Sequence, residues 1–349
     1  MSAQQWRRLG SRPVSLPAVG LGTAPLAGLY EPIAESAADG VLAAAWRRGT
    51  RYFDTSPWYG RGLSELRLGR FLRQFPRGDF ILSTKIGRTF HRPVDAQHYR
   101  SEFWAGGLPF EHRFDYTYEG VMRSYEQSLM RLGLNTIDLL LIHDLDIAEI
   151  GSRDLVEHHL RDLERSGWRA LEELRSHKEV AAIGAGVNIG GTITTMLQRF
   201  ELDFFLVAMP YTLLSQEPLS DEFPLCGQRG VGIVIGSPFA SGILATGNNA
   251  ARPLYNYVPA QEPVIQKTQR IEAVCARYGV ELKAAALQFP LLLPLVSSVI
   301  FGAIDAAQVE QNLQLAQQPI PLRLWRDLLE EGLIHPDSCP SAVAGEAQS

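Results

Sequence analysis

Short apolar runs alternate with helical segments along almost the whole chain, and this alternation restricts the possible folds more than any other feature. The runs expected to form strands are Pro17–Leu21, Arg51–Phe53, Phe80–Thr84, Ile137–Ile142, Val180–Gly186, Phe204–Ala208, Val231–Ile235 and Ser298–Ile300. The helical segments that follow them are 34–48, 64–73, 118–132, 167–177, 192–199, 217–229, 264–278 and 305–316. Strands that alternate with helices pair in parallel, and eight such units close into a barrel. The sequence therefore predicts an α/β fold, a (β/α)8 TIM barrel.

The remaining segments fit around a single barrel. A length of 349 residues suits one barrel with extended loops, so we expect a single domain over residues 1–334. Residues 8–12 can turn a short N-terminal hairpin, Ser64 is expected to cap the second helix, and residues 322–332 have the pattern of an extra C-terminal helix. Residues 335–349 are rich in Ser, Ala and Pro, which predicts a mobile tail.

Charge, cysteine usage and the N-terminal residues restrict the partner classes and the cellular compartment. The net charge of −5 and the isoelectric point near 5.9 leave no basic footprint for nucleic acid. The cysteines, Cys226, Cys275 and Cys339, are odd in number and form no CxxC spacing, which favours a reducing compartment over a disulfide framework. The N-terminus lacks the apolar core of a signal peptide. We therefore expect a cytoplasmic protein.

One uncharged stretch, residues 284–304, is long enough to cross a bilayer. Pro290 and Pro294 lie inside it, however, and a proline in a helix interior costs about 3 kcal/mol. We interpret the stretch as the end of a buried helix followed by a strand, and we expect no membrane association.

Four titratable residues, Asp54, Tyr59, Lys85 and His143, stand at or just past the ends of the second, third and fourth predicted strands. Each one alone has a simpler explanation, such as a turn residue or a solvated strand end. The carboxyl ends of parallel barrel strands meet at one mouth, where active sites of such barrels lie. We therefore expect the four side chains to converge.

These residue types together suit proton transfer to and from an oxygen. A free tyrosine titrates near ~10, too high for easy exchange at neutral pH. A neighbouring Lys85 ammonium is expected to lower the pKa of Tyr59, and Asp54 would hold that ammonium charged and oriented. His143 can then position the oxygen that gains or loses the proton.

The chain resembles the aldo-keto reductase family over essentially its full length. The carrying segments are 53–60 (Phe-Asp-Thr-Ser-Pro-Trp-Tyr-Gly), 83–85, 140–143, 187–188, 236–242 and 302–312. The resemblance implies that Tyr59 is the acid/base, that Lys85 and Asp54 tune it, and that His143 orients the substrate. Segments 54–57, 108–111 and 114–116 are most similar to aldose 1-dehydrogenases acting on L-fucose, D-threo-aldoses or L-galactose, with pyridoxal 4-dehydrogenases as close relatives.

The resemblance and the barrel geometry together predict a nicotinamide cofactor site. Loops after the seventh and eighth strands of such barrels commonly bind phosphate, and Asn188 would bind the cofactor carboxamide. The residues expected to contact the cofactor are Thr23, Asn188, Ser237, Phe239, Ser241, Gly242, Leu244, Gly302, Gln308, Gln311 and Asn312. Many relatives carry, at the position of Gly236, a tyrosine that stacks on nicotinamide.

The segment after the eighth strand, residues 301–312, carries no positive charge, whereas NADP-using relatives place Lys or Arg there. Asp305 and Glu310 would repel a 2′-phosphate, so we expect NAD, with NADP less favoured. The alternative is that a basic residue arrives from another loop, for example Arg252.

A long aromatic segment, residues 87–117, is expected to select the substrate, because ordered loops of this length are usually functional. The alternative is a satellite core beneath a lid. The residues expected to contact the substrate are Trp58, Trp104, Phe110, Tyr116 and His143. An aromatic pocket with a few polar groups suits a sugar.

The leading hypothesis is NAD-dependent oxidation of an aldose at C1 to the lactone by a monomer or weak homo-oligomer. The alternatives are a pyridoxal 4-dehydrogenase, an NADPH-dependent aldehyde or ketone reductase, and a non-catalytic nicotinamide-binding subunit. We expect no metal, because no carboxylate or thiolate set at ligand spacing accompanies the remaining histidines considered, His112, His158, His159 and His177.

Overall fold

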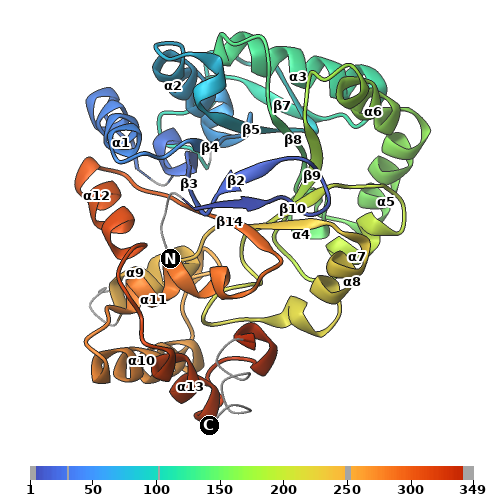
Figure 1. Ribbon diagram of the computed structural model, residues 1–349. Helices are drawn as coiled ribbons and strands as arrows, with labels where there is room; N and C mark the ends of the chain where they lie inside the picture. The colour runs from blue at the N-terminus through green and yellow to red at the C-terminus, as the bar shows by residue number, and fades with distance from the viewer. Residues whose placement is uncertain (1–4, 30, 101–102, 248–252, 341–349) are drawn as a thin grey trace.

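The computed structural model describes residues 5–29, 31–100, 103–247 and 253–340. Eight parallel strands form a closed barrel in the spatial order β10-β11-β14-β3-β4-β5-β8-β9 (Figure 1). The strands are β3 (Val19–Gly22), β4 (Tyr52–Asp54), β5 (Ile81–Ile86), β8 (Leu139–His143), β9 (Ala182–Val187), β10 (Phe204–Val207), β11 (Gly232–Ile235) and β14 (Val296–Phe301). Every predicted strand is present, so the predicted (β/α)8 barrel is confirmed.

Helices cover the outside of the barrel (Figure 1). Those that match predicted segments are α1 (Glu35–Arg47), α2 (Leu63–Leu72), α3 (Tyr118–Leu132), α6 (Trp168–Ser176), α7 (Thr192–Leu197), α8 (Glu222–Arg229), α10 (Glu262–Arg277), α12 (Ala306–Leu315) and α13 (Leu322–Glu330). Local chemistry sets the ends of α3, because the Thr117 side chain accepts a hydrogen bond from the Gly120 N–H and Gly133 takes a left-handed conformation.

The barrel strands are buried on both faces, which explains their continuous apolar runs. One cluster fills the barrel interior, including Tyr52, Leu141 and Phe204, and a larger one lies between strands and helices. The predicted hairpin is formed by β1 (Trp6–Arg8) and β2 (Ser15–Pro17), which pair antiparallel. Leu9 and Leu16 from this hairpin join the interior cluster. The hairpin therefore extends the core at the N-terminal end of the barrel.

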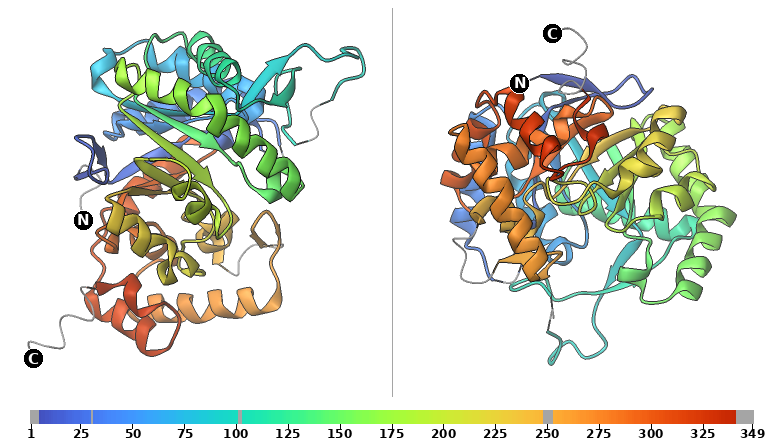
Figure 2. Two further views of the ribbon diagram at one scale, coloured as in Figure 1. Left: turned by 90° about the vertical axis from the view of Figure 1, so that its right-hand side faces the viewer. Right: turned by 90° about the horizontal axis from the view of Figure 1, so that it is seen from below.

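Several elements were not predicted. Within the long aromatic segment, β6 (Arg88–His91) pairs antiparallel with β7 (Glu111–Phe114). This ribbon projects from the body on the same side as a second hairpin, β12 (Leu254–Tyr255) and β13 (Val258–Pro259) (Figure 2). The other additional helices are α4 (Ile147–Ile150), α5 (Arg153–Asp162) and α9 (Ile243–Thr246). Helix α11 (Leu282–Gln288), followed by β14, confirms the interpretation of residues 284–304 as the end of a buried helix and a strand. Asp146 and Ser152 cap α4 and α5 with their side chains, a signal that the sequence already contained.

The C-terminal segment is packed further than the sequence suggested. The His335 N–H donates to Gln216 Oε1 at 3.1 Å, and Cys339 is fully buried. The expected tail therefore does not begin at residue 335, and residues 341–349 lie outside the described part of the chain. Cys226, Cys275 and Cys339 are all buried, and none of them forms a disulfide bond. Over the described residues, no helix combines the length and the apolar character needed to span a membrane.

Candidate active site

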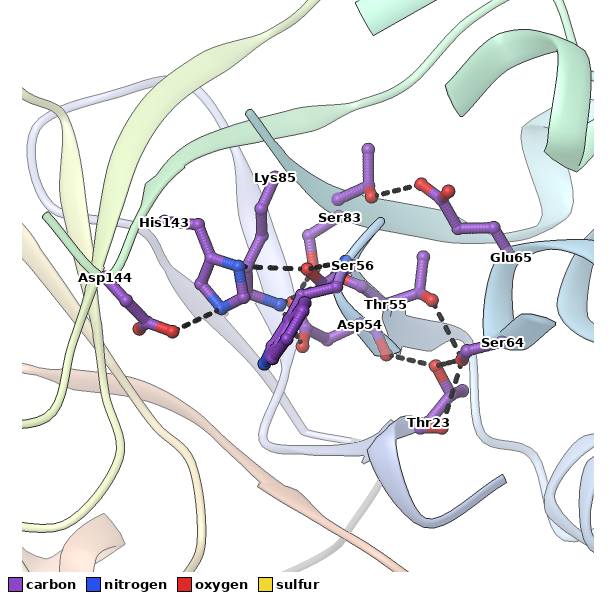
Figure 3. A network of polar contacts seen from close by, with 12 residues as sticks. Thr23, Asp54, Thr55, Ser56, Ser64, Glu65, Ser83, Lys85, His143 and Asp144 are labelled. Carbon is purple, nitrogen blue, oxygen red and sulfur yellow. Dashed lines mark hydrogen bonds and ion pairs between the residues drawn. The ribbon is translucent and has the colours of Figure 1, made fainter. Parts of the chain in front are cut away.

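Asp54 and Lys85 form a buried ion pair at the carboxyl end of the barrel. Asp54 ends β4 and lies opposite Ser83 in the register with β5, which also carries Lys85. Lys85 Nζ donates to Asp54 Oδ2 at 2.8 Å and to the Thr55 carbonyl oxygen at 2.7 Å. Ser83 Oγ donates to the other carboxylate oxygen at 2.7 Å. The side chains of the pair are only 1 and 2% exposed, so their positions are fixed by the core (Figure 3).

Tyr59 reaches the same place from a tight turn after β4. The next three residues, Gly60, Arg61 and Gly62, all take left-handed conformations, with φ of 63°, 56° and 101°. Glycine tolerates this backbone, whereas it strains a residue such as Arg61. Lys85 Nζ lies 4.6 Å from the centre of the Tyr59 ring, and the ring centres of Tyr59 and His143 are 5.9 Å apart. The structure therefore brings together the four residues that the sequence singled out.

The expected direction of the Tyr59 pKa is wrong for this arrangement. Burial and the nearby carboxylates of Asp54 and Asp144 raise the pKa of Tyr59 well above its usual value. Burial is the largest cause, and Lys85 does not outweigh it because the ammonium donates to Asp54 and the Thr55 carbonyl oxygen. Asp54 thus compensates part of the Lys85 charge, and the remaining stabilisation of the phenolate by the ammonium is smaller than the effect of burial.

His143 is held by hydrogen bonds to both ring nitrogens. Nδ1 accepts from the Arg88 guanidinium at 3.0 Å and lies 3.0 Å from Ser56 Oγ. Arg88 has no acceptor, so the ring proton must sit on Nε2, which lies 3.0 Å from Asp144 Oδ2. Burial and the positive charges of Arg88 and Lys85 hold the pKa of His143 well below its usual value. Figure 3 shows the imidazole between Ser56 and Asp144. His143 is therefore a neutral N–H donor.

Arg88 was not predicted as a site residue. Its side chain is 1% exposed and lies between the rings of Trp58 and Phe114, each 4.9 Å from the guanidinium carbon. It also donates to Glu149 at 2.6 Å. The sequence signal was a second basic residue three positions after Lys85, but only the β6–β7 ribbon brings it to His143.

Asp144 was also missed, although it directly follows His143 in the sequence. Its backbone is left-handed, with φ of 45°, and its side chain is 12% exposed. One carboxylate oxygen faces His143, and the other accepts from Asn188 Nδ2 at 2.8 Å. Burial raises the pKa of Asp144 to about 7, against the opposing effect of Arg88.

Thr23, which follows β3, and Ser64 on α2 form hydrogen bonds within the protein. Thr23 Oγ1 donates to the Asp54 carbonyl oxygen at 2.8 Å and accepts from Ser64 Oγ at 2.7 Å. Ser64 does not cap α2, because the helix begins at Leu63 with Gly62 at the cap position. A cofactor contact by Thr23 remains a prediction.

The other expected cofactor residues lie in the loop after β11 and on α12. Ser237 and Ser241 have left-handed backbones, and the 237–242 turn leads through Gly242 into α9, where Leu244 is buried. The Ser241 hydroxyl accepts from the Tyr257 N–H at 3.0 Å, and the Tyr257 side chain is hydrogen-bonded to Ser237. The tip of the β12–β13 hairpin therefore rests on the loop after β11.

On α12, Gln311 accepts from Lys283 Nζ at 2.8 Å, and the same ammonium lies 5.6 Å from the centre of the Phe239 ring. Gln308 Oε1 accepts from the Ile304 N–H at 3.2 Å, just after Gly302 and β14. Asn312 is 1% exposed, and its Oδ1 has no hydrogen-bond partner among the described residues. Helix α12 thus holds a buried acceptor, Asn312 Oδ1, to which a ligand could donate a hydrogen bond.

The residues expected to contact the substrate differ in position and exposure. Trp104 lies beside Tyr59 and Trp58, with its ring centre 5.8 Å from that of Tyr59 and 6.0 Å from that of Trp58. Phe110 is exposed, and its carbonyl oxygen accepts from Arg61. The expected substrate contact of Tyr116 is wrong, because its side chain is fully buried and its hydroxyl donates to the His143 carbonyl oxygen at 3.1 Å. It supports the end of β8 and has no surface for a substrate.

The expectation for the His158–His159 pair also needs correction. Asp162, one turn further along α5, lies 3.4 Å from His158 Nε2, and the three residues have possible ligand atoms within 4.8 Å of one another. His159 instead packs against Tyr116, with ring centres 5.2 Å apart. A carboxylate is therefore present at ligand distance, contrary to the sequence argument.

Removing Arg88 tests its control of His143. In Arg88→Met, we expect the pKa of His143 to rise towards its usual value, because the variant loses a nearby positive charge and a donor to Nδ1. Nitrogen chemical shifts of the imidazole, followed against pH by NMR, measure both pKa and tautomer. Arg88→Lys keeps a charge and is the matched control. An unchanged His143 titration in Arg88→Met would show that burial and Lys85 set the pKa of His143 without Arg88.

Sequence comparisons show which proteins share these features. The model of the Aldo/keto reductase family matches residues 18–326. The chain is 40% identical to a pyridoxal 4-dehydrogenase from Microbacterium luteolum, covering 96% of this chain and 99% of that protein. It is 38% identical to a D-threo-aldose 1-dehydrogenase from Pseudomonas sp., covering 92 and 95%. It is 30% identical to the L-galactose dehydrogenase of Arabidopsis thaliana, covering 95 and 94%.

Solved structures share the same fold at low identity. An aldo-keto reductase from Bacillus halodurans, in its holo form, has a TM-score of 0.72 at 23% identity, covering 95% of this chain and 97% of that one. A glycerol dehydrogenase from Gluconobacter oxydans has a TM-score of 0.72 at 18% identity, covering 97% of each chain. The family match over most of the chain, with dehydrogenases as relatives, shows that this protein is an oxidoreductase of the aldo/keto reductase family.

Proposed function

We propose that this protein is an NAD-dependent dehydrogenase that oxidises an aldose at C1 to the lactone, with Tyr59 as the general base. The observation that carries the proposal is the convergence of Tyr59, the Lys85–Asp54 pair and a neutral His143 at one end of the barrel. Similarity to sugar dehydrogenases supports an aldose as the substrate.

The chain's own residues can perform the proton transfer. His143 Nε2–H donates to the substrate hydroxyl oxygen and so fixes its position beside the Tyr59 oxygen. Tyr59 takes the hydroxyl proton, and Lys85 stabilises the phenolate before that transfer. A nicotinamide dinucleotide, when bound, supplies the hydride acceptor. Because the pKa of Tyr59 is raised, the basic form is scarce at neutral pH and oxidation should accelerate as the pH rises.

The proposed cofactor residues fit a dinucleotide. The unpaired, buried Asn312 Oδ1 offers an acceptor on α12, which begins after the Asp305 cap. The turn at Ser237–Gly242 contains consecutive left-handed residues, a backbone form that exposes N–H groups to anions. Asn188 is half-buried beside Asp144, in reach of the catalytic residues.

Charge around α12 favours NAD, although three nearby cations complicate the sequence argument. Arg47 and Arg48 from α1 approach this helix, but both pair with Glu310, at 3.8 and 3.2 Å. The Lys283 ammonium contacts both the Phe239 ring and Gln311. Arg252, considered above, lies outside the described residues. We propose NAD, with Lys283 as the group through which NADP could be tolerated.

Initial rates with NAD and NADP on a panel of aldoses, pyridoxal and aldehydes test the proposed function. We expect aldose oxidation with NAD to exceed that with NADP by roughly tenfold or more, because a 2′-phosphate would meet Asp305 while Arg47 and Arg48 already pair with Glu310. Lys283→Met should reduce the remaining NADP rate more than the NAD rate. Turnover confined to NADPH and carbonyl compounds would contradict both the direction and the cofactor.

Pyridoxal oxidation is the second candidate, favoured by the 40% identity to a pyridoxal 4-dehydrogenase. The same panel separates it from sugar oxidation through the ratio of kcat/KM values. A non-catalytic nicotinamide-binding role would appear as cofactor binding without turnover of any panel compound. The complete Tyr59, Lys85, Asp54 and His143 arrangement argues against that role.

A further inference from the structure

We infer that Asp144 is a specificity-determining residue whose carboxylate accepts a hydrogen bond from a second hydroxyl of the substrate, close to the reacting carbon. This inference rests on the proposed function and names the substrate class of the same site. It predicts a preference for compounds that carry two neighbouring hydroxyls, or a hydroxyl next to a carbonyl group.

Asp144 is the carboxylate that faces the reacting centre and has capacity to spare. Its Oδ2 lies 3.0 Å from His143 Nε2, and its side chain is 12% exposed, so it reaches the surface of the site. Asp54 is different, because Lys85 and Ser83 occupy its two oxygens and its side chain is 2% exposed. Of these two acidic groups, Asp144 is therefore the one that a substrate can contact.

The single N–H of His143 creates the selectivity. It points to Asp144 in this structure, and during catalysis the substrate oxygen competes with Asp144 for the same N–H. A ligand with one oxygen accepts the hydrogen bond from the His143 N–H. The Asp144 carboxylate oxygen then lacks a hydrogen-bond donor, and leaving a buried acceptor unpaired is costly. A ligand with a second hydroxyl replaces the lost donor with its own. Sites built to bond a particular hydroxyl reject analogues that lack it strongly.

Asp144 has little freedom to escape this loss of a partner. Its backbone is left-handed, and its N–H donates to the Gly186 carbonyl oxygen at 3.2 Å. Its other oxygen is held by Asn188 at 2.8 Å. Arg88 gives weak compensation, because its nearer acidic partner is Glu149 at 2.6 Å, against 3.9 Å for Asp144. A left-handed backbone is uncommon at residues other than glycine, and such positions cluster at functional sites.

The chemistry fits the proposed substrates. An aldose presents its C2 hydroxyl next to the anomeric hydroxyl, so one hydroxyl can bond His143 while the other bonds Asp144. Pyridoxal carries a ring hydroxyl near its aldehyde group and satisfies the same requirement. Simple aldehydes and alcohols do not. The burial that raises the pKa of Asp144 to about 7 also means that its acceptor strength grows as the pH passes through that value.

The test compares kcat/KM for an aldose and its 2-deoxy analogue in the wild type and in Asp144→Ala. We expect the wild type to prefer the hydroxylated sugar by roughly 10²-fold, and the variant to bring the ratio close to one by losing the hydroxylated substrate selectively. Asp144→Asn keeps an acceptor oxygen and should retain part of the preference. A ratio that stays unchanged while both rates fall would overturn the inference and leave Asp144 as a support for His143.

Asp146→Asn is the matched control. Asp146 is a buried carboxylate two residues further on, and it accepts from the Ala148 and Glu149 N–H groups to cap α4. This variant should leave the substrate ratio unchanged. If no aldose is oxidised, the proposed function fails, and the same ratio is measured for reduction of glycolaldehyde against acetaldehyde. A preference for glycolaldehyde that disappears in Asp144→Ala would then still support the inference, and no preference would overturn it.

Discussion

Tyr59→Phe should lower kcat for substrate oxidation by roughly 10²- to 10⁴-fold, the usual contribution of a positioned acid or base. The substitution removes one oxygen and leaves the ring, which packs beside Trp104 and His143 and faces Lys85. Packing and cofactor contacts should therefore survive. Dissociation constants for NAD, measured by quenching of tryptophan fluorescence, should change by less than about twofold, well under the 1.4 kcal/mol that a tenfold change represents.

The pH profile gives an independent check on this residue. The raised pKa of Tyr59 means that the phenolate increases throughout the alkaline range, so wild-type oxidation should continue to rise with pH beyond neutrality. Reduction of a carbonyl needs the phenol as an acid and should not share this rise. The residual activity of Tyr59→Phe should lack the alkaline limb. A variant that keeps the wild-type rate and profile would exclude Tyr59 as the base.

Lys85→Met should destabilise the protein as well as abolish most activity. It leaves the Asp54 carboxylate buried with Ser83 as its remaining side-chain donor, and removing one partner of a buried pair typically costs about 3–5 kcal/mol. Urea unfolding measures this loss of folding free energy. Initial rates measure the second effect, which follows because no ammonium remains to stabilise the Tyr59 phenolate.

The double variant Asp54→Asn/Lys85→Met separates the two effects. It replaces both charges with neutral groups of similar size, so most of the lost folding free energy should return. Activity should not return, because the ammonium is still missing. Recovery of activity together with stability would mean that the ion pair supports only the fold. A single Lys85→Met variant as stable as the wild type would contradict the burial argument.

The barrel and its four central residues could be predicted because both depend on local patterns. Apolar runs followed by helical segments are fixed by the period of each element, and a parallel barrel collects every strand end at one mouth. Asp54, Lys85 and His143 follow directly from that rule, since each lies at or near the carboxyl end of a strand. Helices α4 and α5 were missed, although their Asp146 and Ser152 caps were readable.

Other contacts in the site join elements that are separate in the sequence, and no local sequence pattern predicts that these elements meet. Arg88 reaches His143 because the β6–β7 ribbon turns it inward, and Lys283 reaches Gln311 because α11 packs against α12. Tyr116 has the composition of a pocket residue, but it is buried behind the end of β8. Its burial follows from how the ribbon folds back against that strand.

The sequence by itself determined the fold, the family and the four residues that we propose for proton transfer, because strand order and strand ends carry that information. Only the tertiary structure decided the direction of the pKa shifts of Tyr59 and His143 and the placement of Asp144. A pKa depends on burial and on every charge within several ångströms, and these distances are set by side chains from remote parts of the chain. For this reason the direction of the Tyr59 shift could not be read from the presence of Lys85 alone.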